Sequence, residues 1–231
     1  MAKKYNITRE ETDQYALQSQ QRWKAAHDAG FFKDEIEPIK MKGKKGNEEL
    51  YETDEHPRPQ TTMEQLGKLP TVFKKENGTV TAASASGICD GAAAVIICNE
   101  EAVKKYNLKP LARFIGYHVS GVEPTLMGFG PVPAIENLLK KTKKTVSDID
   151  LFDINEAFAP QFLACRKTLQ LPKEKTNVNG GAIALGHPLG ASGTRITVNL
   201  IHELRRRKAK YGVGSACIGG GQGISVLVES I

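Results

Sequence analysis

The spacing of apolar residues predicts a series of helices along the chain. Thr8-Arg9-Glu10-Glu11 forms a capping box, so we expect a helix from there to about Ala29, ended by Gly30. Apolar side chains recur at helical spacing over 131–139 and again over 196–204, and another helix is expected from about Phe158. A run of small residues over 86–94 also favours a helix.

Short apolar runs between these helices predict strands over 79–81, 93–98, 111–119, 151–154, 213–217 and 224–228. Residues 35–70 are charged and interrupted by Pro and Gly, with a strand-like piece at 36–39. We expect this stretch to be a small, irregular surface subdomain or a long functional loop. Strands that alternate with helices indicate an α/β fold with a mixed sheet.

Composition adds little to this picture. A chain of 231 residues with 25% charged and 40% hydrophobic residues is ordinary for a globular protein that buries one or two cores. No apolar run approaches the roughly 20 residues of a membrane span, and the polar start is too short for a signal peptide and lacks transit-peptide bias. Four cysteines without CxxC spacing give weak support for metal or disulfides and favour a reducing compartment.

The net charge of +6 lies largely in three basic runs, at 40–46, 140–144 and 205–208. No aromatic residues interleave with them, so a nucleic-acid surface is not expected. The last two runs end predicted helices, where cations meet the helix dipole favourably. Solvated helix ends explain those two runs, and a phosphate-rich ligand is the alternative for the first.

Two glycine-rich loops carry the candidate chemistry. His187 lies in the loop 177–193, between Gly186 and Pro188, and Cys217 opens a second such loop over 217–223. An imidazole and a thiol framed by exposed backbone amides suit acyl or proton transfer. The plain alternatives are a surface histidine and a buried structural cysteine.

A third block, Asn155-Glu156, directly follows the predicted strand 151–154 and precedes Pro160. Because Pro is tolerated only in the first turn of a helix, this pair lies at a strand-to-helix junction, where side chains point into a cleft. Asn155 is also a good helix cap, and the two roles are compatible. Glu156 is expected to anchor the loop without taking part in chemistry.

These three blocks, in this order and spacing, resemble the C-terminal half of the thiolase family, and are most similar to its mitochondrial 3-ketoacyl-CoA thiolases (acetyl-CoA acyltransferases). The resemblance implies a thiolase-like αβαβα layered fold in which two α/β halves pack together. It divides this chain into part of a loop domain (1–76), the end of the N-terminal domain (77–110) and the C-terminal domain (111–231).

The resemblance also implies catalytic roles. The His187 position takes the proton from the nucleophilic thiol and helps to hold the thioester oxygen. Cys217 is the base that removes the α-proton of acetyl-CoA and the acid in the reverse direction. Asn155 orients a water that stabilises the enolate oxygen, and the Gly219 amide contributes to an oxyanion hole.

For coenzyme A, the resemblance implies contacts from Arg58 to the nucleotide portion, from Thr61, and from Ser86 to the pantetheine arm. Each of these residues alone is more simply explained as structural, and 81–86 departs from the commoner Gly-Asn-Ala-Ser of the family. Residues 127–131 resemble a segment that lines the acyl pocket; a hydrophobic turn is the alternative. The remaining histidines are expected to be structural: His27, His56, His118 and His202.

Thiolases carry their nucleophilic cysteine in a Cys-Gly-Ser-Gly-like stretch of the N-terminal half, and this sequence has no such stretch. Two hypotheses follow: a thiolase of fatty-acid β-oxidation whose nucleophile lies outside this sequence, or a non-catalytic fragment that binds coenzyme A or pairs with a thiolase subunit. The first implies acyl-CoA and CoA as substrates, no permanently bound cofactor or metal, a homodimer or homotetramer of the full-length form, and the mitochondrial matrix.

Overall fold

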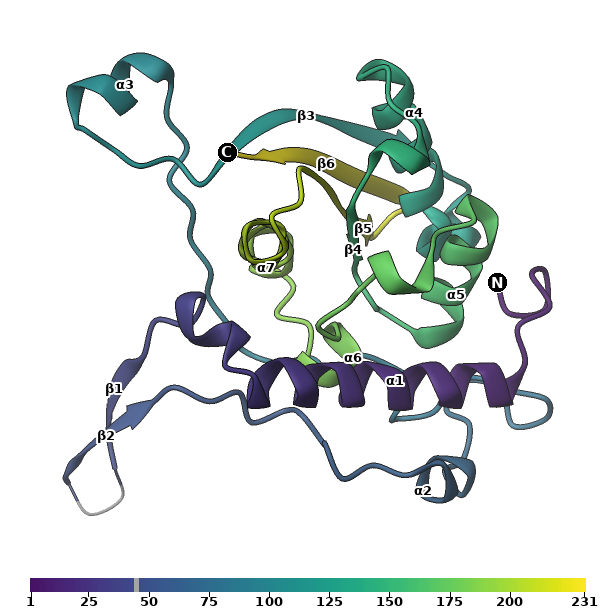
Figure 1. The fold of residues 1–231 in the computed structure, drawn as a ribbon. Helices are drawn as coiled ribbons and strands as arrows, with labels where there is room; N and C mark the ends of the chain where they lie inside the picture. Colours follow the sequence, from purple (N-terminus) through teal and green to yellow (C-terminus); the bar gives the residue numbers. More distant parts are fainter. Residues whose placement is uncertain (44–45) are drawn as a thin grey trace.

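The C-terminal half of the chain forms a sheet with helices on both faces, and the long helix α1 lies along one end of it (Figure 1). The computed structural model describes residues 1–43 and 46–231. Figure 1 also shows that the paired strands β1 (Ile39–Lys42) and β2 (Glu48–Tyr51) and the helix α3 (Glu100–Lys105) stand away from the rest of the molecule.

Helix α1 spans Arg9–Asp28, which confirms the helix predicted from its capping box. The Thr8 side chain accepts a hydrogen bond from the amide of Glu11, and the Glu11 carboxylate accepts from the amide of Thr8. Gly30 follows the C-cap with a φ of +73°, the left-handed conformation that glycine adopts without strain. A single turn of 3₁₀ helix, η1 (Phe31–Asp34), comes next.

The sheet has the strand order β3–β6–β5–β4 and is mixed, as predicted. Its strands are β3 (Ala112–Gly121), β4 (Leu151–Ile154), β5 (Tyr211–Ile218) and β6 (Gln222–Ser230). β4 runs parallel to β5, whereas β6 is antiparallel to both of its neighbours. Every residue of β4 is buried, because helices cover this strand on both faces.

The helices of this unit place the main core on one face of the sheet. α4 (Pro131–Lys141) and α5 (Ala159–Leu169) pack on one face with part of α1, and α7 (Ser192–Arg207) packs on the other. The short helix α6 (Ala182–Leu185) contacts α1. The 3₁₀ turns are η2 (Pro124–Phe129), η3 (Val146–Asp148) and η4 (Lys173–Lys175).

Residues 35–70 are irregular, as expected. They hold the paired strands β1 (Ile39–Lys42) and β2 (Glu48–Tyr51), whose residues are all exposed, and the short helix α2 (Met63–Gly67). The strand expected at 36–39 was placed too early, since β1 begins at Ile39. Of the basic run 40–46, residues 44 and 45 lie outside the described residues.

The elements predicted between 79 and 98 are wrong. No helix forms over 86–94 and no strand over 93–98; the next element is α3 (Glu100–Lys105), and Thr81 makes only an isolated bridge to Thr71. A strand exists only through hydrogen bonds to a neighbouring strand. Within the described residues, 93–98 has no such neighbour, and Ile96 and Ile97 are 90% and 80% exposed.

Within residues 1–43 and 46–231, no helix is both long enough and apolar enough to cross a membrane.

Candidate active site

The ends of β4 and β5 bring two of the predicted site residues to one edge of the sheet. Ile154 pairs with Ser215 in the parallel ladder, and the amide of the next residue, Asn155, donates to the Ser215 carbonyl at 2.8 Å. Cys217 lies two residues further along β5. Side chains at the carboxyl ends of parallel strands face a common crevice, so this edge is the natural place for a site.

His187 reaches the same edge from the loop after α6. Its amide donates to the carbonyl of Gly87 at 2.8 Å, which fixes the loop against residues 86–88. Its ring Nε2 lies 3.3 Å from Nδ2 of Asn155, and its Nδ1 lies 2.6 Å from the Ser192 hydroxyl. The structure therefore joins His187 and Asn155 directly.

The electrostatic surroundings keep the imidazole neutral. Burial, followed by the charge of Arg195, holds the pKa of His187 below its usual range. A neutral imidazole has one nitrogen with a free lone pair and can act as a base at neutral pH.

The loop before His187 requires a glycine at position 186. Its φ is +89°, and a Cβ at this position would lie 2.5 Å from the sulfur of Cys89. Any side chain here would combine backbone strain with a steric clash, so Gly186 allows His187 to approach residues 87–89 closely.

Cys217 is mostly buried near the end of β5, where it pairs with Gly223 of β6. Burial raises the pKa of its thiol, so the sulfur stays protonated at neutral pH. A cysteine acts as a thiolate base at neutral pH only where its pKa is lowered, so burial disfavours the role of base that the resemblance implies. The structure instead favours the protonated form, the one that can donate a proton.

The turn after Cys217 leaves room beside the thiol. Gly220 and Gly221 have φ values of +86° and +92°, and a Cβ on Gly219 would meet no atom within 4 Å. Segment 127–131 packs against the start of β6, directly after this turn, where a Cβ on Gly130 would lie 2.2 Å from the carbonyl oxygen of Gln222. The segment expected to line an acyl pocket thus lies beside the turn that follows Cys217.

Glu156 anchors the Asn155 loop, as expected. Its carboxylate is fully buried and accepts hydrogen bonds from the hydroxyls of Tyr15 at 2.5 Å and Ser19 at 2.7 Å, both on α1. It also accepts from Asn177 Nδ2 at 3.0 Å and the Ile183 amide at 3.1 Å. One carboxylate therefore ties α1, the glycine-rich loop and the strand β4 together.

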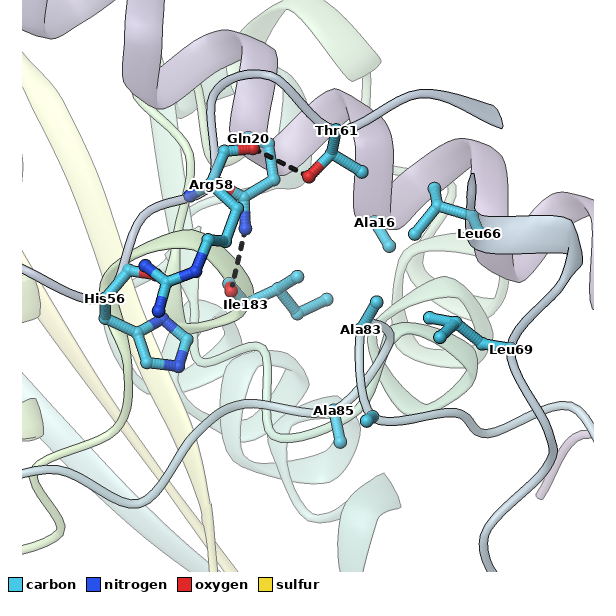
Figure 2. Close-up of a pocket in the computed structure, with 11 residues that line it drawn as sticks. Ala16, Gln20, His56, Arg58, Thr61, Leu66, Leu69, Ala83, Ala85 and Ile183 are labelled. Carbon is cyan, nitrogen blue, oxygen red and sulfur yellow. Dashed lines mark hydrogen bonds between the residues drawn. The ribbon is translucent and has the colours of Figure 1, made fainter. Parts of the chain in front are cut away.

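A pocket of about 270 Å³ lies between α1 and the loops around it, and Figure 2 shows Arg58 and His56 at one end with Leu66 and Leu69 at the other. Arg58 and Thr61, two of the predicted coenzyme A contacts, both line it. The remaining lining residues are mostly small or apolar: Ala16, Gln20, Ala82, Ala83, Ala85 and Ile183.

Arg58 is held by backbone oxygens. One guanidinium nitrogen donates to the carbonyls of residues 55, 56 and 57 at 2.7, 2.7 and 2.9 Å, and the Arg58 amide donates to Gln20 Oε1 at 2.8 Å. The Thr61 hydroxyl donates to the Arg58 carbonyl at 2.7 Å, as Figure 2 shows. Arg58 and Thr61 are thus held together. The other two guanidinium nitrogens of Arg58 make no hydrogen bond within the described residues.

Ser86 does not line the pocket but connects it to His187. Its amide and hydroxyl donate to the Ala157 carbonyl at 3.0 and 3.2 Å. Its neighbour Ala85 lines the pocket, and its neighbour Gly87 accepts the hydrogen bond from His187. Residues 85–87 therefore run from the pocket wall to the histidine.

Sequence reasoning missed three residues of this site. His56 was expected to be structural, yet it lines the pocket, and its Nδ1 lies 2.8 Å from the Ala184 carbonyl oxygen. Gln20 orients Arg58, and Ser192 contacts His187. The only sequence signal for His56 was its place in His56-Pro57-Arg58-Pro59, next to a residue already singled out.

In the part of the chain that the structure describes, no three His, Cys, Asp or Glu side chains gather in a way that could hold a metal ion. All four cysteines are free thiols, with Cys165 buried and Cys98 exposed.

Comparison with known families agrees with the geometry. The family model described as "Thiolase, N-terminal domain" matches residues 1–101, and that described as "Thiolase, C-terminal domain" matches residues 108–230. The chain is 65% identical over 230 residues to the mitochondrial 3-ketoacyl-CoA thiolase of Bos taurus, covering 100% of this chain and 57% of that relative.

Solved structures give the same result. The crystal structure of human mitochondrial 3-ketoacyl-CoA thiolase matches with a TM-score of 0.97 and 65% identity, covering 100% of this chain and 58% of that one. The human thiolase in complex with CoA matches with a TM-score of 0.95 and 64% identity, with 57% of that chain covered. The chain thus spans somewhat more than half the length of the relatives it matches.

Proposed function

Because this chain belongs to the thiolase family, we propose that Asn155, His187 and Cys217 form part of an acyltransferase active site that cleaves 3-oxoacyl-CoA with CoA. The products are acetyl-CoA and an acyl-CoA shortened by the same unit. The observation that carries the proposal is the direct contact of His187 with Asn155 at the edge of the sheet where β5 brings Cys217.

In this proposal His187 activates the nucleophile. A cysteine thiol supplied by residues outside this sequence gives its proton to the imidazole, and the thiolate attacks the 3-oxo carbon of the substrate. The lowered pKa of His187 favours this role, because the neutral ring can accept that proton.

Cys217 handles the proton of the second step. Cleavage of the carbon–carbon bond leaves acetyl-CoA as an enolate, which takes a proton from the Cys217 thiol, while the nucleophilic cysteine retains the acyl group. The raised pKa of Cys217 suits this direction, since the thiol is protonated before the step. CoA then receives the acyl group from the acylated cysteine.

Two groups of hydrogen-bond donors stabilise the developing negative charge. Asn155, with an ordered water, and His187 face the enolate oxygen, and the Gly219 amide serves a second oxyanion position beside Cys217. The open space at Gly219 supports this assignment.

We place coenzyme A, as a substrate, in the pocket of Figure 2, and the proposed reaction needs no permanently bound cofactor. Arg58 faces the nucleotide portion, where its free guanidinium nitrogens pair with phosphate or stack on adenine. Two hydroxyl groups extend the contact with coenzyme A. Thr61 lies beside Arg58, and Ser86 lies on the segment between the pocket and His187, along which the pantetheine arm runs.

The names of the relatives support the cellular setting of the proposal. The relative from Bos taurus is called mitochondrial, and we assign this chain to the mitochondrial matrix and to fatty-acid β-oxidation. We also assign a homodimer or homotetramer to its full-length form.

The second candidate function is a non-catalytic fragment that binds coenzyme A or pairs with a thiolase subunit. The exposed apolar residues between 88 and 97 favour pairing, because such a run is normally covered by protein. This second candidate differs from the first because it predicts no thioester cleavage either by the chain alone or by the chain joined to an N-terminal thiolase part.

The test compares this chain with a chimera. The purified 231-residue chain, and a chimera that joins the N-terminal part of the Bos taurus relative to it, are each mixed with acetoacetyl-CoA and CoA, and thioester cleavage is followed. We expect cleavage by the chimera, and none by the chain alone above a His187→Ala control. A well-folded chimera without activity would support the non-catalytic fragment instead.

A further inference from the structure

Ser192 contacts the ring nitrogen of His187 that faces away from Asn155. It is the first residue of α7 and is 3% exposed. Its hydroxyl oxygen lies 2.6 Å from His187 Nδ1 and 3.0 Å from the carbonyl oxygen of Pro188. A serine hydroxyl has one proton, so it can donate to only one of these two atoms.

The carbonyl of Pro188 can only accept, and it also accepts from the amides of Ala191 and Ser192, whereas Nδ1 donates or accepts according to the tautomer of the ring. Ser192 donates to this oxygen four residues earlier in the chain, a common bond for serine at a helix. The hydroxyl oxygen is then left to accept, and the atom that donates to it is Nδ1 of His187. With the hydroxyl proton directed to Pro188, this contact requires a proton on Nδ1.

The contact on the other side of the ring agrees with this tautomer for the amide orientation found in the structure. The Asn155 amide nitrogen carries two protons and no lone pair for accepting, and it lies 3.3 Å from His187 Nε2. With the amide in this orientation Nε2 accepts and carries no proton in the neutral ring, while Asn155 Oδ1 is buried without a hydrogen-bond partner among the described residues. Both neighbours of the imidazole thus select one tautomer.

From this arrangement we infer that Ser192 is a positioning residue that fixes the tautomer of His187, with the proton on Nδ1 and the free lone pair on Nε2. Solvent-exposed imidazoles exchange between both tautomers, and only one of them presents a base to the cleft. Ser192 therefore holds His187 ready to accept a proton at Nε2, on the Asn155 side.

The use of Nε2 as the base rests on the proposed function, but the tautomer itself does not. Failure of the chimera to turn over would overturn the proposed function and leave the tautomer assignment standing. An Nε2-protonated ring would overturn this inference while leaving the thiolase assignment intact. The two ideas therefore fail in different experiments.

The test is nitrogen NMR of the whole 231-residue chain labelled with ¹⁵N-histidine at a pH where His187 is neutral. His187→Ala identifies its signals by their loss, and magic-angle-spinning spectra of sedimented protein supply the same shifts if the chain self-associates. We expect a protonated, pyrrole-type Nδ1 and an unprotonated, pyridine-type Nε2. A wild-type ring protonated at Nε2 would overturn the inference without any further variant.

Substitutions at Ser192 test whether this residue sets the preference. Ser192→Ala should shift the ratio of the two tautomers toward Nε2–H by roughly fivefold, the factor that one ordinary hydrogen bond supplies. Ser192→Thr, which keeps the hydroxyl, should show the same tautomer ratio as wild type. An unchanged ratio in Ser192→Ala would contradict the inference.

Thr197 provides the matched control. It lies on the same helix and donates to the Gly193 carbonyl at 2.8 Å, the same four-residue bond that Ser192 makes, but it is on the exposed side. Thr197→Ala should therefore leave the His187 tautomers unchanged. An equal shift in Thr197→Ala would show that the effect comes from loosening α7, and the inference would be wrong.

Discussion

Strand β4 and the segment 93–98 have similar apolar character but opposite fates. Leu151–Ile154 is buried at all four positions between helices on both faces of the sheet. Val95, Ile96 and Ile97, by contrast, are 43%, 90% and 80% exposed. The first region has a paired strand beside it, and the second, within the residues described, has none.

The difference shows that an apolar run becomes a strand only where a neighbouring backbone is present. The segment 93–98 lies in the part matched by the N-terminal domain of the thiolase family, while this chain covers 57% of its Bos taurus relative. We therefore propose that the segment pairs with thiolase sequence beyond this chain. In the function proposed above, the active site follows the same division, with Asn155, His187 and Cys217 in this chain and the nucleophile outside it.

The largest effect is expected in the core of the C-terminal unit. Phe162 on α5 is almost fully buried in the main cluster, so Phe162→Ala should lower the free energy of unfolding by about 3–5 kcal/mol. Urea denaturation followed by circular dichroism measures it. A loss below about 1 kcal/mol would mean that this region is no better packed than the segment 93–98.

Glu156→Ala should be nearly as costly, because it leaves buried donors on Tyr15, Ser19 and Asn177 without their acceptor. We expect a loss of roughly 3 kcal/mol in the free energy of unfolding. The matched control is Glu136→Ala on the exposed face of α4, which should change stability by less than about 0.5 kcal/mol. Equal effects in the two variants would contradict the anchoring role.

Glu35 makes stability depend on pH. Burial raises the pKa of Glu35 to about 7 from its ordinary 4.5, against the opposing hydrogen bond from Asn199 and charge of Arg195. A carboxyl with a raised pKa binds its proton more tightly in the folded state than in the unfolded state. Its contribution to the free energy of unfolding is therefore complete below about pH 4.5 and is lost as pH rises through about 7.

Glu35→Gln should remove this loss. The free energy of unfolding of the variant, relative to that of wild type, should be about 1–3 kcal/mol higher at pH 8 than at pH 5, as measured by urea unfolding at both pH values. A difference between the two proteins that stays constant with pH would show that Glu35 is not held protonated by burial.

The smallest effect is expected where the chain is exposed. Ile96→Ala should change the stability of the chain alone by less than about 0.5 kcal/mol, because its side chain is 90% exposed. The same change should reduce binding of a hydrophobic dye, and in the chimera it should cost about 2 kcal/mol or more once the segment is covered. Equal effects in chain and chimera would argue against a partner for this segment.

The sequence predicted the elements whose pattern is completed by the chain itself. The capping box at Thr8 marked α1, and apolar spacing marked α4, α7 and the strands β3 to β6. The prediction over 86–98 was wrong because propensity cannot show whether a partner strand is present.

The candidate site shows the same limit. His187 and Asn155 were identified by motif, and the structure joins them by a hydrogen bond. His56 and Ser192 were missed because their roles come from contacts made after folding, with the pocket and with the far side of the imidazole. The direction of the Cys217 pKa also depends on burial, which the glycines after it did not reveal.

The central claim is that His187 activates the nucleophile and Cys217 transfers the α-carbon proton. The most direct measurement is rapid-quench labelling of the chimera with radiolabelled acetyl-CoA, which records acyl-enzyme formation separately from turnover. We predict that Cys217→Ser still acquires the label but does not complete condensation or cleavage, and that His187→Ala is labelled far more slowly. Loss of labelling in Cys217→Ser together with normal labelling in His187→Ala would reverse the two roles and contradict the account.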